Sequence, residues 1–167
     1  MIKFEQLFNA LNKKRVRYLL AGGIAVNLYG IERATADIDL VVDLEEGNLN
    51  KFITVMKELN FKPKIPVKLE DFIKPEKRES WIREKGIMVF SLFDPKNQFF
   101  LLDIFVEMPF DFEKVYEVRE NMKAGKIIIS VVPLKYLIEM KEKAGRPQDI
   151  ADVFYLKKVK KEWKNED

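Results

Sequence analysis

The feature that most constrains this chain is a pair of adjacent glycines, Gly22-Gly23, at the end of the apolar run YLLA. The apolar residues predict the end of a buried strand. Glycine adopts turn conformations that other residues resist and leaves its backbone N–H groups uncovered. Residues 23–29 then predict the first turns of a short helix closed by Gly30. Because the N-terminus of a helix that follows a glycine turn attracts anions, the segment indicates a phosphate-binding site.

Two aspartates follow after thirteen intervening residues, Asp37 and Asp39 in the segment ADIDLVV. On a strand, residues two apart point to the same face and lie roughly 6–7 Å apart. Two such carboxylates repel each other unless a cation lies between them, and they can hold two ions about 3.5–4 Å apart. A ligand set of oxygens alone suits Mg²⁺ or Mn²⁺. The alternative is a capping or salt-bridged acid pair at a strand end.

A third acid, Asp103, lies within the apolar segment FFLLDIFV. An unpaired charge in a buried strand costs several kcal/mol, and a metal ion is a natural compensation. Glu107 shares the strand face of Asp103 and is the alternative ligand. Its position at the strand end, before Met-Pro, favours exposure to solvent, so Asp103 is preferred.

These residues resemble the signature of the polymerase-beta-type nucleotidyltransferase superfamily: Gly-Gly or Gly-Ser, then a D-x-D strand, then a carboxylate on a later strand. The fuller string at 21–40, AGGIAVNLYGIERATADIDL, is similar to the small prokaryotic subgroup that includes the AbiEii-type toxins. The segment at 140–153, MKEKAGRPQDIADV, is similar to that subgroup's second motif, K-x-x-A-x-R-x-x-D-x-x-D. Together the two motifs bracket most of the chain.

The resemblance implies an α+β fold in which a mixed β-sheet is flanked by helices. It implies one nucleotidyltransferase domain over residues 1–167, with a core at 1–110 and a hairpin and C-terminal helices at 111–167. The implied activity is transfer of an NMP from an NTP to a hydroxyl acceptor, with Mg²⁺ or Mn²⁺ as cofactor and release of pyrophosphate.

The resemblance also implies roles for individual residues. Asp37, Asp39 and Asp103 would be the catalytic residues and metal ligands. Phosphate would be bound by Gly22, Gly23, Arg33, Thr35 and Lys141. Lys141 would itself be positioned by a second layer of residues, Arg146, Asp149 and Asp152. The family often has Ser where this chain has Gly23, so that contact must come from backbone or from another residue. Arg33 fits either a phosphate or a surface carboxylate.

Lys141 lies on the apolar stripe of a predicted helix, at i+7 from Leu134. A lysine there either snorkels to solvent or points into a cleft, and the motif favours the cleft. The basic C-terminal segment KKVKKEWK has the lysines that commonly end a helix, and a contact with RNA phosphates is the less favoured reading.

The acceptor stays open between a tRNA 3′ end, a hydroxyl of a partner protein and a small molecule. Two other readings are a nucleotide- or RNA-binding module without turnover, and the toxin of a toxin–antitoxin pair, with an antitoxin as partner. The chain has no Cys and no His, which excludes thiol and imidazole chemistry. A formal charge of +3 is too small to predict a nucleic-acid partner. No membrane span or signal peptide is evident, so we expect a cytoplasmic protein.

Hydrophobic spacing and turn residues predict the remaining elements. An acidic capping box at 43–46 is expected to open a helix that Asn60 ends, and residues 68–80 read as a loop. Helices are predicted at 4–14, from Pro133 to Gly145 and from Pro147 onward; strands are predicted at 17–21, 38–42, 61–67, 81–93 and 98–107, with a further hairpin at 115–132.

Overall fold

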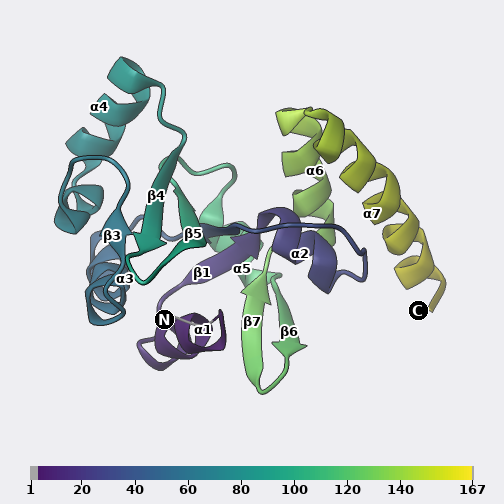
Figure 1. Cartoon of the computed structure of the whole chain (residues 1–167). Coiled ribbons are helices and arrows are strands. Elements are labelled where there is room, and N and C mark those ends of the chain that lie inside the picture. Colours follow the sequence, from purple (N-terminus) through teal and green to yellow (C-terminus); the bar gives the residue numbers. More distant parts are fainter. Residues whose placement is uncertain (1–3, 167) are drawn as a thin grey trace.

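The computed structural model describes residues 4–166 and contains one mixed sheet in the order β3-β4-β5-β2-β1-β7-β6 (Figure 1). The β1–β7 and β2–β5 pairs are parallel and the other neighbours are antiparallel. The strands are β1 Tyr18–Ala21, β2 Ile38–Val42, β3 Lys62–Pro63, β4 Val89–Asp94, β5 Asn97–Phe105, β6 Glu120–Ala124 and β7 Ile127–Val131. The predicted α+β fold with a mixed sheet is confirmed.

Helices flank this sheet, with α6 and α7 packed as a pair on the side opposite α4 (Figure 1). They are α1 Phe4–Lys13, α2 Gly22–Leu28, α3 Glu46–Glu58, the 3-10 helix η1 Leu69–Ile73, α4 Pro75–Lys85, α5 Phe112–Glu117, α6 Leu134–Ala144 and α7 Pro147–Glu166. Within residues 4–166, no helix combines the length and apolar character needed to cross a membrane.

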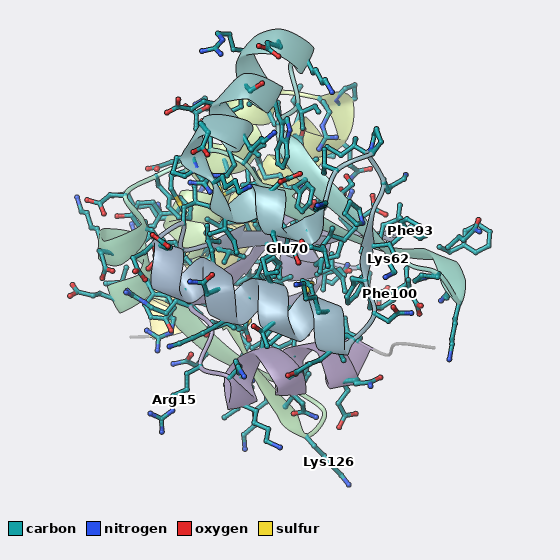
Figure 2. The ribbon with its side chains drawn as sticks, turned by 90° about the vertical axis from the view of Figure 1, so that its left-hand side faces the viewer. Arg15, Lys62, Glu70, Phe93, Phe100 and Lys126 are labelled. Atoms are coloured by element: carbon teal, nitrogen blue, oxygen red, sulfur yellow. The ribbon has the colours of Figure 1, made fainter. Side chains whose placement is uncertain are left out.

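The outer half of the sheet has one packed face and one open face. On β4, Phe90 and Leu92 are buried, while Val89, Ser91 and Phe93 are only half-buried. On β5 the same alternation runs from Leu101 to Phe105, with Leu102 and Ile104 buried. On β2, all residues are buried except Asp39, which is half-buried. Figure 2 shows Phe93 beside Lys62 at the outer edge, where the two residues are cross-strand partners. The open face carries Asp39 and Asp103, so the fold leaves these acids accessible.

Three predicted boundaries were wrong on the outer half of the sheet. The predicted loop at 68–80 contains η1 and the start of α4, and the predicted strand at 81–93 begins only at Val89, because Trp81 belongs to α4. Pro75 at the first helical position and Gly86 in the left-handed conformation at φ 62° mark this helix, which is highly charged and buries few residues. The predicted strand at 61–67 is only the two-residue β3.

Two further local predictions were wrong. The predicted hairpin at 115–132 begins only with β6, because residues 112–117 form α5, capped by the side chain of Asp111. The capping box at 43–46 is absent: Glu45, rather than Asp43, caps α3 by accepting from the backbone N–H groups of Gly47 and Asn48. Asn60, at φ 61°, and Gly145, at φ 64°, follow α3 and α6 as predicted.

Candidate active site

Four neighbouring strands bring a row of residues together across the open face. Asp39 on β2 is the cross-strand partner of Ala21 on β1 and of Asp103 on β5. Asp103 is in turn the partner of Ser91 on β4. Residues two apart along β2 share a face, so Asp37, which immediately precedes the strand, completes an acidic row with Asp39 and Asp103. Asp39 and Asp103 are more than sixty residues apart in the sequence, and the parallel pairing of β2 with β5 brings them side by side.

The glycine pair fits closely around this row. A Cβ atom at Gly22 would lie 2.0 Å from Oδ2 of Asp39, and Gly22 has a φ of +68°. A Cβ atom at Gly23 would lie 2.0 Å from Nη1 of Arg33 and 2.5 Å from Oγ1 of Thr35. Gly22 is therefore required both by its positive φ and by Asp39, whereas a side chain at Gly23 would have to displace Arg33 and Thr35. The polar groups of Arg33 and Thr35 lie where a side chain at position 23 would project.

The acidic row carries charge that the protein does not neutralise. The pKa of Asp39 is raised to about 7, first by burial and then by the nearby carboxylates of Asp103 and Asp37, against the opposing effect of Lys141 and Arg146. Burial also raises the pKa of Asp103, although a hydrogen bond from the hydroxyl of Ser91 partly offsets this. Glu107 is exposed beyond the end of β5.

The acidic row matches Mg²⁺ by its chemistry, since it offers carboxylate oxygens only. Within residues 4–166, no three acidic side chains are gathered closely enough to form a complete metal site by themselves. Mg²⁺ is commonly held by one or two carboxylates together with water and substrate phosphates. The adjacent pair Asp39 and Asp103 provides such a partial site, and Asp39 is a carboxylate whose pKa is raised mainly by burial.

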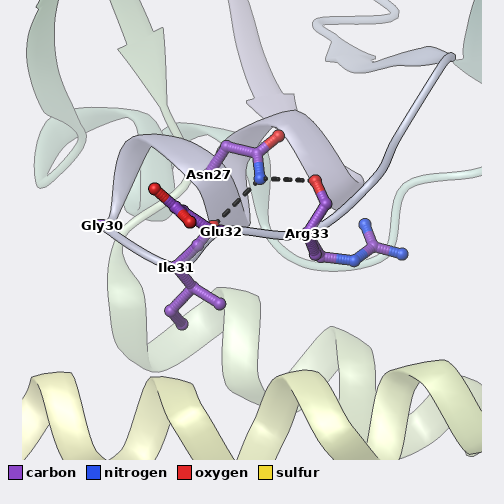
Figure 3. Close-up of a pocket in the computed structure, with 5 residues that line it drawn as sticks. All are labelled: Asn27, Gly30, Ile31, Glu32 and Arg33. Carbon is purple, nitrogen blue, oxygen red and sulfur yellow. Dashed lines mark hydrogen bonds between the residues drawn. The ribbon is translucent and has the colours of Figure 1, made fainter.

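The loop between α2 and β2 holds Arg33 in place. The side-chain amide of Asn27 donates to the backbone carbonyls of Ile31 and Arg33, at 3.0 and 3.1 Å. Figure 3 shows these bonds and the side chain of Arg33, which extends away from Asn27. An open cavity of about 460 Å³ at this loop is lined by Asn27, Gly30, Ile31, Glu32 and Arg33.

The second motif folds into an ion network made of Arg33, Lys141, Arg146, Asp149 and Asp152. Nζ of Lys141 lies 3.2 Å from Oδ1 of Asp149 and 3.1 Å from Oδ2 of Asp152. Nε of Arg33 lies 3.3 Å from Oδ1 of Asp152, which ties the loop before β2 to α7. Both aspartates are almost fully buried. Arg33 thus meets a carboxylate, but a buried one at the site and not one on the surface.

Arg146 completes the ion network through Asp149. Its Nε donates to Oδ2 of Asp149 at 2.7 Å, although its side chain is 74% exposed. Burial alone would raise the pKa of Asp149, but hydrogen bonds from Arg146 and Lys141 outweigh it and hold that pKa below its usual range. With three cations and two carboxylates, the ion network carries one net positive charge.

The C-terminal helix α7 packs against the C-terminal end of α2. The ring of Trp163 on α7 packs against Tyr29 at 5.3 Å, directly after α2, and the hydroxyl of Tyr29 donates to the carbonyl of Val132 at 2.7 Å. The only Trp of the basic C-terminal segment is therefore a packing residue between helices.

Comparison with known proteins agrees with this geometry. A family model described as nucleotidyl transferase AbiEii toxin, type IV TA system, matches residues 6–166. The chain belongs to the AbiEii nucleotidyltransferase toxin family. The resemblance predicted from the two motifs is confirmed, and this AbiEii-family protein is a nucleotidyltransferase. No curated protein sequence shows a significant match.

Solved structures share the fold of this AbiEii-family chain. The lincosamide antibiotic adenylyltransferase LnuA, bound to lincomycin, matches with a TM-score of 0.61 at 16% identity, over 95% of this chain and 98% of LnuA. The nucleotidyltransferase-type protein TM1012 from Thermotoga maritima has a TM-score of 0.57 at 16% identity, over 98% and 91% of the two chains. ANT(2″)-Ia in complex with adenylyl-2″-tobramycin has a TM-score of 0.57 at 12% identity, over 93% and 90%. At these identities the likeness concerns the fold alone.

Sequence reasoning missed Ser91. Its residue type carries no motif signal, and only the strand register places its hydroxyl on Asp103. An alternating strand with one polar residue on its otherwise apolar open face, between Val89 and Phe93, is the weak signal that the sequence does contain.

Proposed function

We propose that this AbiEii-family protein transfers an NMP from an NTP to a hydroxyl acceptor, with Mg²⁺ as its cofactor. One observation carries the proposal: Asp39 lies opposite Asp103 across β2 and β5, and its carboxylate packs directly on the glycine pair. A site for divalent ions would therefore lie beside the N-terminus of α2, whose first backbone N–H groups have no partner within the helix and no side-chain cap. Asp37, Asp39 and Asp103 would be the ligands.

The triphosphate would lie between the glycine pair and the ion network. Gly22 and Gly23 supply backbone N–H groups, and Arg33 and Thr35 supply donors in the space that the missing side chain of Gly23 leaves. Lys141 lies close enough to lower the pKa of Asp39, and it belongs to a network with a positive surplus. The ion network thus supports a role in neutralising phosphate charge, with Arg146, Asp149 and Asp152 fixing Lys141.

The chemistry is a substitution at the α-phosphorus. The acceptor oxygen forms a bond to that phosphorus, the bond to the α–β bridging oxygen breaks, and pyrophosphate leaves with the electron pair. Because the chain has no His or Cys, the carboxylate of Asp103 is the natural group to orient the hydroxyl and take its proton. Bound Mg²⁺ would offset the charge that develops on the phosphates.

Isothermal titration calorimetry tests the donor half of the proposal. Wild-type protein titrated with each of the four NTPs should bind at least one of them only when Mg²⁺ is present, and the double variant Asp37→Ala/Asp39→Ala should not bind it. Binding that is equal in the two proteins, or independent of Mg²⁺, would contradict the assignment of the acidic row.

Label transfer tests turnover against the alternative of a binding module without activity. The protein is incubated with α-labelled NTPs and, separately, with total RNA, cell lysate or pooled small metabolites. A labelled product identifies the acceptor class among RNA, protein and small molecule. NTP binding without any labelled product would favour the module without turnover.

The family match also supports a biological role as the toxin of a toxin–antitoxin pair. Such a toxin would use the cytoplasmic NTP pool and would have an antitoxin as partner. Induced expression should then arrest growth, and the variant Asp39→Asn should not arrest it. Arrest that persists in this variant would separate toxicity from nucleotide transfer.

A further inference from the structure

Ser91 makes the only side-chain hydrogen bond that reaches Asp103 within residues 4–166. Its hydroxyl donates to Oδ1 of Asp103 at 2.7 Å, between cross-strand partners on β4 and β5. Ser91 itself is fixed by the edge strand, because its backbone carbonyl accepts from the N–H of Lys64 at 2.9 Å. The surrounding open face is apolar, with Val89, Phe93 and Phe105 as neighbours in the same register.

The contact engages one carboxylate oxygen and leaves the charge intact. A Lys or Arg at this position would form an ion pair with Asp103 and compete with a metal ion for it. A neutral hydroxyl instead satisfies Oδ1 and leaves Oδ2 available to a cation or an acceptor hydroxyl. By contrast, no donor within the described part of the chain hydrogen-bonds the carboxylate of Asp39, which packs on Gly22.

We propose that Ser91 is a positioning residue for the transfer reaction: its hydroxyl fixes the rotation of the Asp103 carboxylate so that Oδ2 faces the metal and acceptor side of the site. This inference rests on the proposed function of Asp103. Asp103 has acids on its β2 side, Asp39 and Asp37, and a donor on its β4 side. Without the donor, repulsion between the acids would be free to turn the carboxylate away from a shared ion.

The variants Ser91→Ala and Ser91→Thr test this role. Ser91→Ala removes the hydroxyl, whereas Ser91→Thr keeps it on a residue that strands tolerate well. Ser80→Ala is the matched control, because the hydroxyl of Ser80 donates to a carboxylate oxygen of Glu84 at 3.0 Å on α4, away from the site. Thermal unfolding of each variant establishes that it is folded before it is assayed.

Two readouts are measured on these proteins. At saturating Mg²⁺, transfer from α-labelled NTP is expected to show kcat reduced about 10–100-fold in Ser91→Ala, with KM for NTP unchanged, because orientation of Asp103 then affects the reacting groups and not donor binding. Mn²⁺ titration followed by electron paramagnetic resonance should show affinity about 10-fold weaker in Ser91→Ala. Ser91→Thr should recover both to within about threefold, and Ser80→Ala should match the wild type.

The outcomes separate this inference from the proposed function. Wild-type kcat and Mn²⁺ affinity in Ser91→Ala would overturn the positioning role while leaving the transferase intact. Equal losses in folded Ser91→Ala and Ser91→Thr would also overturn it, since the hydroxyl would then not be the cause. If the wild type binds Mn²⁺ but transfers no label, the proposed function fails, and the role of Ser91 in transfer fails with it. A wild type that binds no Mn²⁺ overturns both.

Discussion

The acidic row and the ion network both contain buried charged side chains, but only the ion network pairs its carboxylates with cations. In the ion network, every buried carboxylate contacts cations of the same chain: Asp149 contacts Lys141 and Arg146, and Asp152 contacts Lys141 and Arg33. In the acidic row, Asp39 and Asp103 have each other as cross-strand partners, and no salt bridge within residues 4–166 reaches either of them.

This difference distinguishes charged groups that stabilise the fold from charged groups that are suited to bind a ligand. The charges of paired buried ions are compensated by the protein itself, and removing one partner leaves the other uncompensated. Unpaired carboxylates whose pKa values are raised by burial and by neighbouring acids are a cost that stability alone does not explain, and such groups gather at functional sites. Mutation in the ion network should therefore cost stability as well as nucleotide binding, whereas mutation in the acidic row should act mainly on activity.

The largest expected effect is on activity in the acidic row. Asp39→Asn should reduce label transfer by about 10³-fold, which is about 4 kcal/mol of barrier, because it removes a charge that acts on the reacting phosphate. Its free energy of unfolding in urea at pH 8 should equal or exceed that of the wild type, since an unpaired buried charge is lost. Glu107→Gln, at the exposed end of β5, is the control and should keep full transfer. A strongly destabilised Asp39→Asn would erase the contrast between the two regions.

In the ion network, stability should respond first. Lys141→Met should lower the free energy of unfolding by about 3 kcal/mol, at the lower end for a broken buried pair, because Arg146 and Arg33 still contact the two aspartates. The matched control is Lys157→Met, which removes an exposed α6–α7 ion pair with Glu142 at 3.9 Å. That control should change stability by no more than about 0.5 kcal/mol. Urea unfolding measures the stability of both variants. Equal losses of stability would contradict the expectation that the buried ion pair contributes more than the exposed one.

The glycine pair allows the two effects to be separated at one residue. Gly22→Ala and Gly30→Ala each place a side chain at positive φ, +68° and +98°, and each should cost about 1–3 kcal/mol of stability. Only at Gly22 would the new Cβ collide with Asp39, whereas the Cβ at Gly30 meets nothing within 4 Å. Transfer by the folded protein should therefore fall in Gly22→Ala and persist in Gly30→Ala. Equal activity in the two variants would show that close packing of Asp39 on the glycine does not matter.

Much of the fold and of the candidate site could be predicted from local signals. The glycine pair, the D-x-D spacing and the helix ends at Asn60 and Gly145 are encoded within a few residues. The helix α4 was missed because its buried residues, Arg78 and Trp81, form no apolar stripe, so it lacked the periodicity on which such predictions depend.

The contact between Ser91 and Asp103 could not be predicted, because it depends on strand register. Extending the Asp94–Asn97 pairing without a shift would set Ser91 opposite Phe100. A register shift between Phe93 and Asp94 sets Ser91 opposite Asp103 instead. Such irregularities arise from packing of the whole hairpin and leave little trace in local sequence.

The smallest expected effect is the pH dependence of stability without metal. Asp39 has its pKa raised from 3.8 to about 7, first by burial and then by the neighbouring acids, so the folded protein holds this proton more tightly than the unfolded chain. The stability that the protonated acid contributes is complete below about pH 4 and is lost as pH rises through 7. Between pH 6 and 8 the wild type should therefore lose about 1 kcal/mol in urea unfolding with chelator present, and Asp39→Asn should lose less. Mg²⁺ competes with the proton, so it should raise the melting temperature more at pH 8 than at pH 6. An identical pH slope in wild type and Asp39→Asn would mean that the acidic row is already compensated within the protein, and the contrast with the ion network would no longer hold.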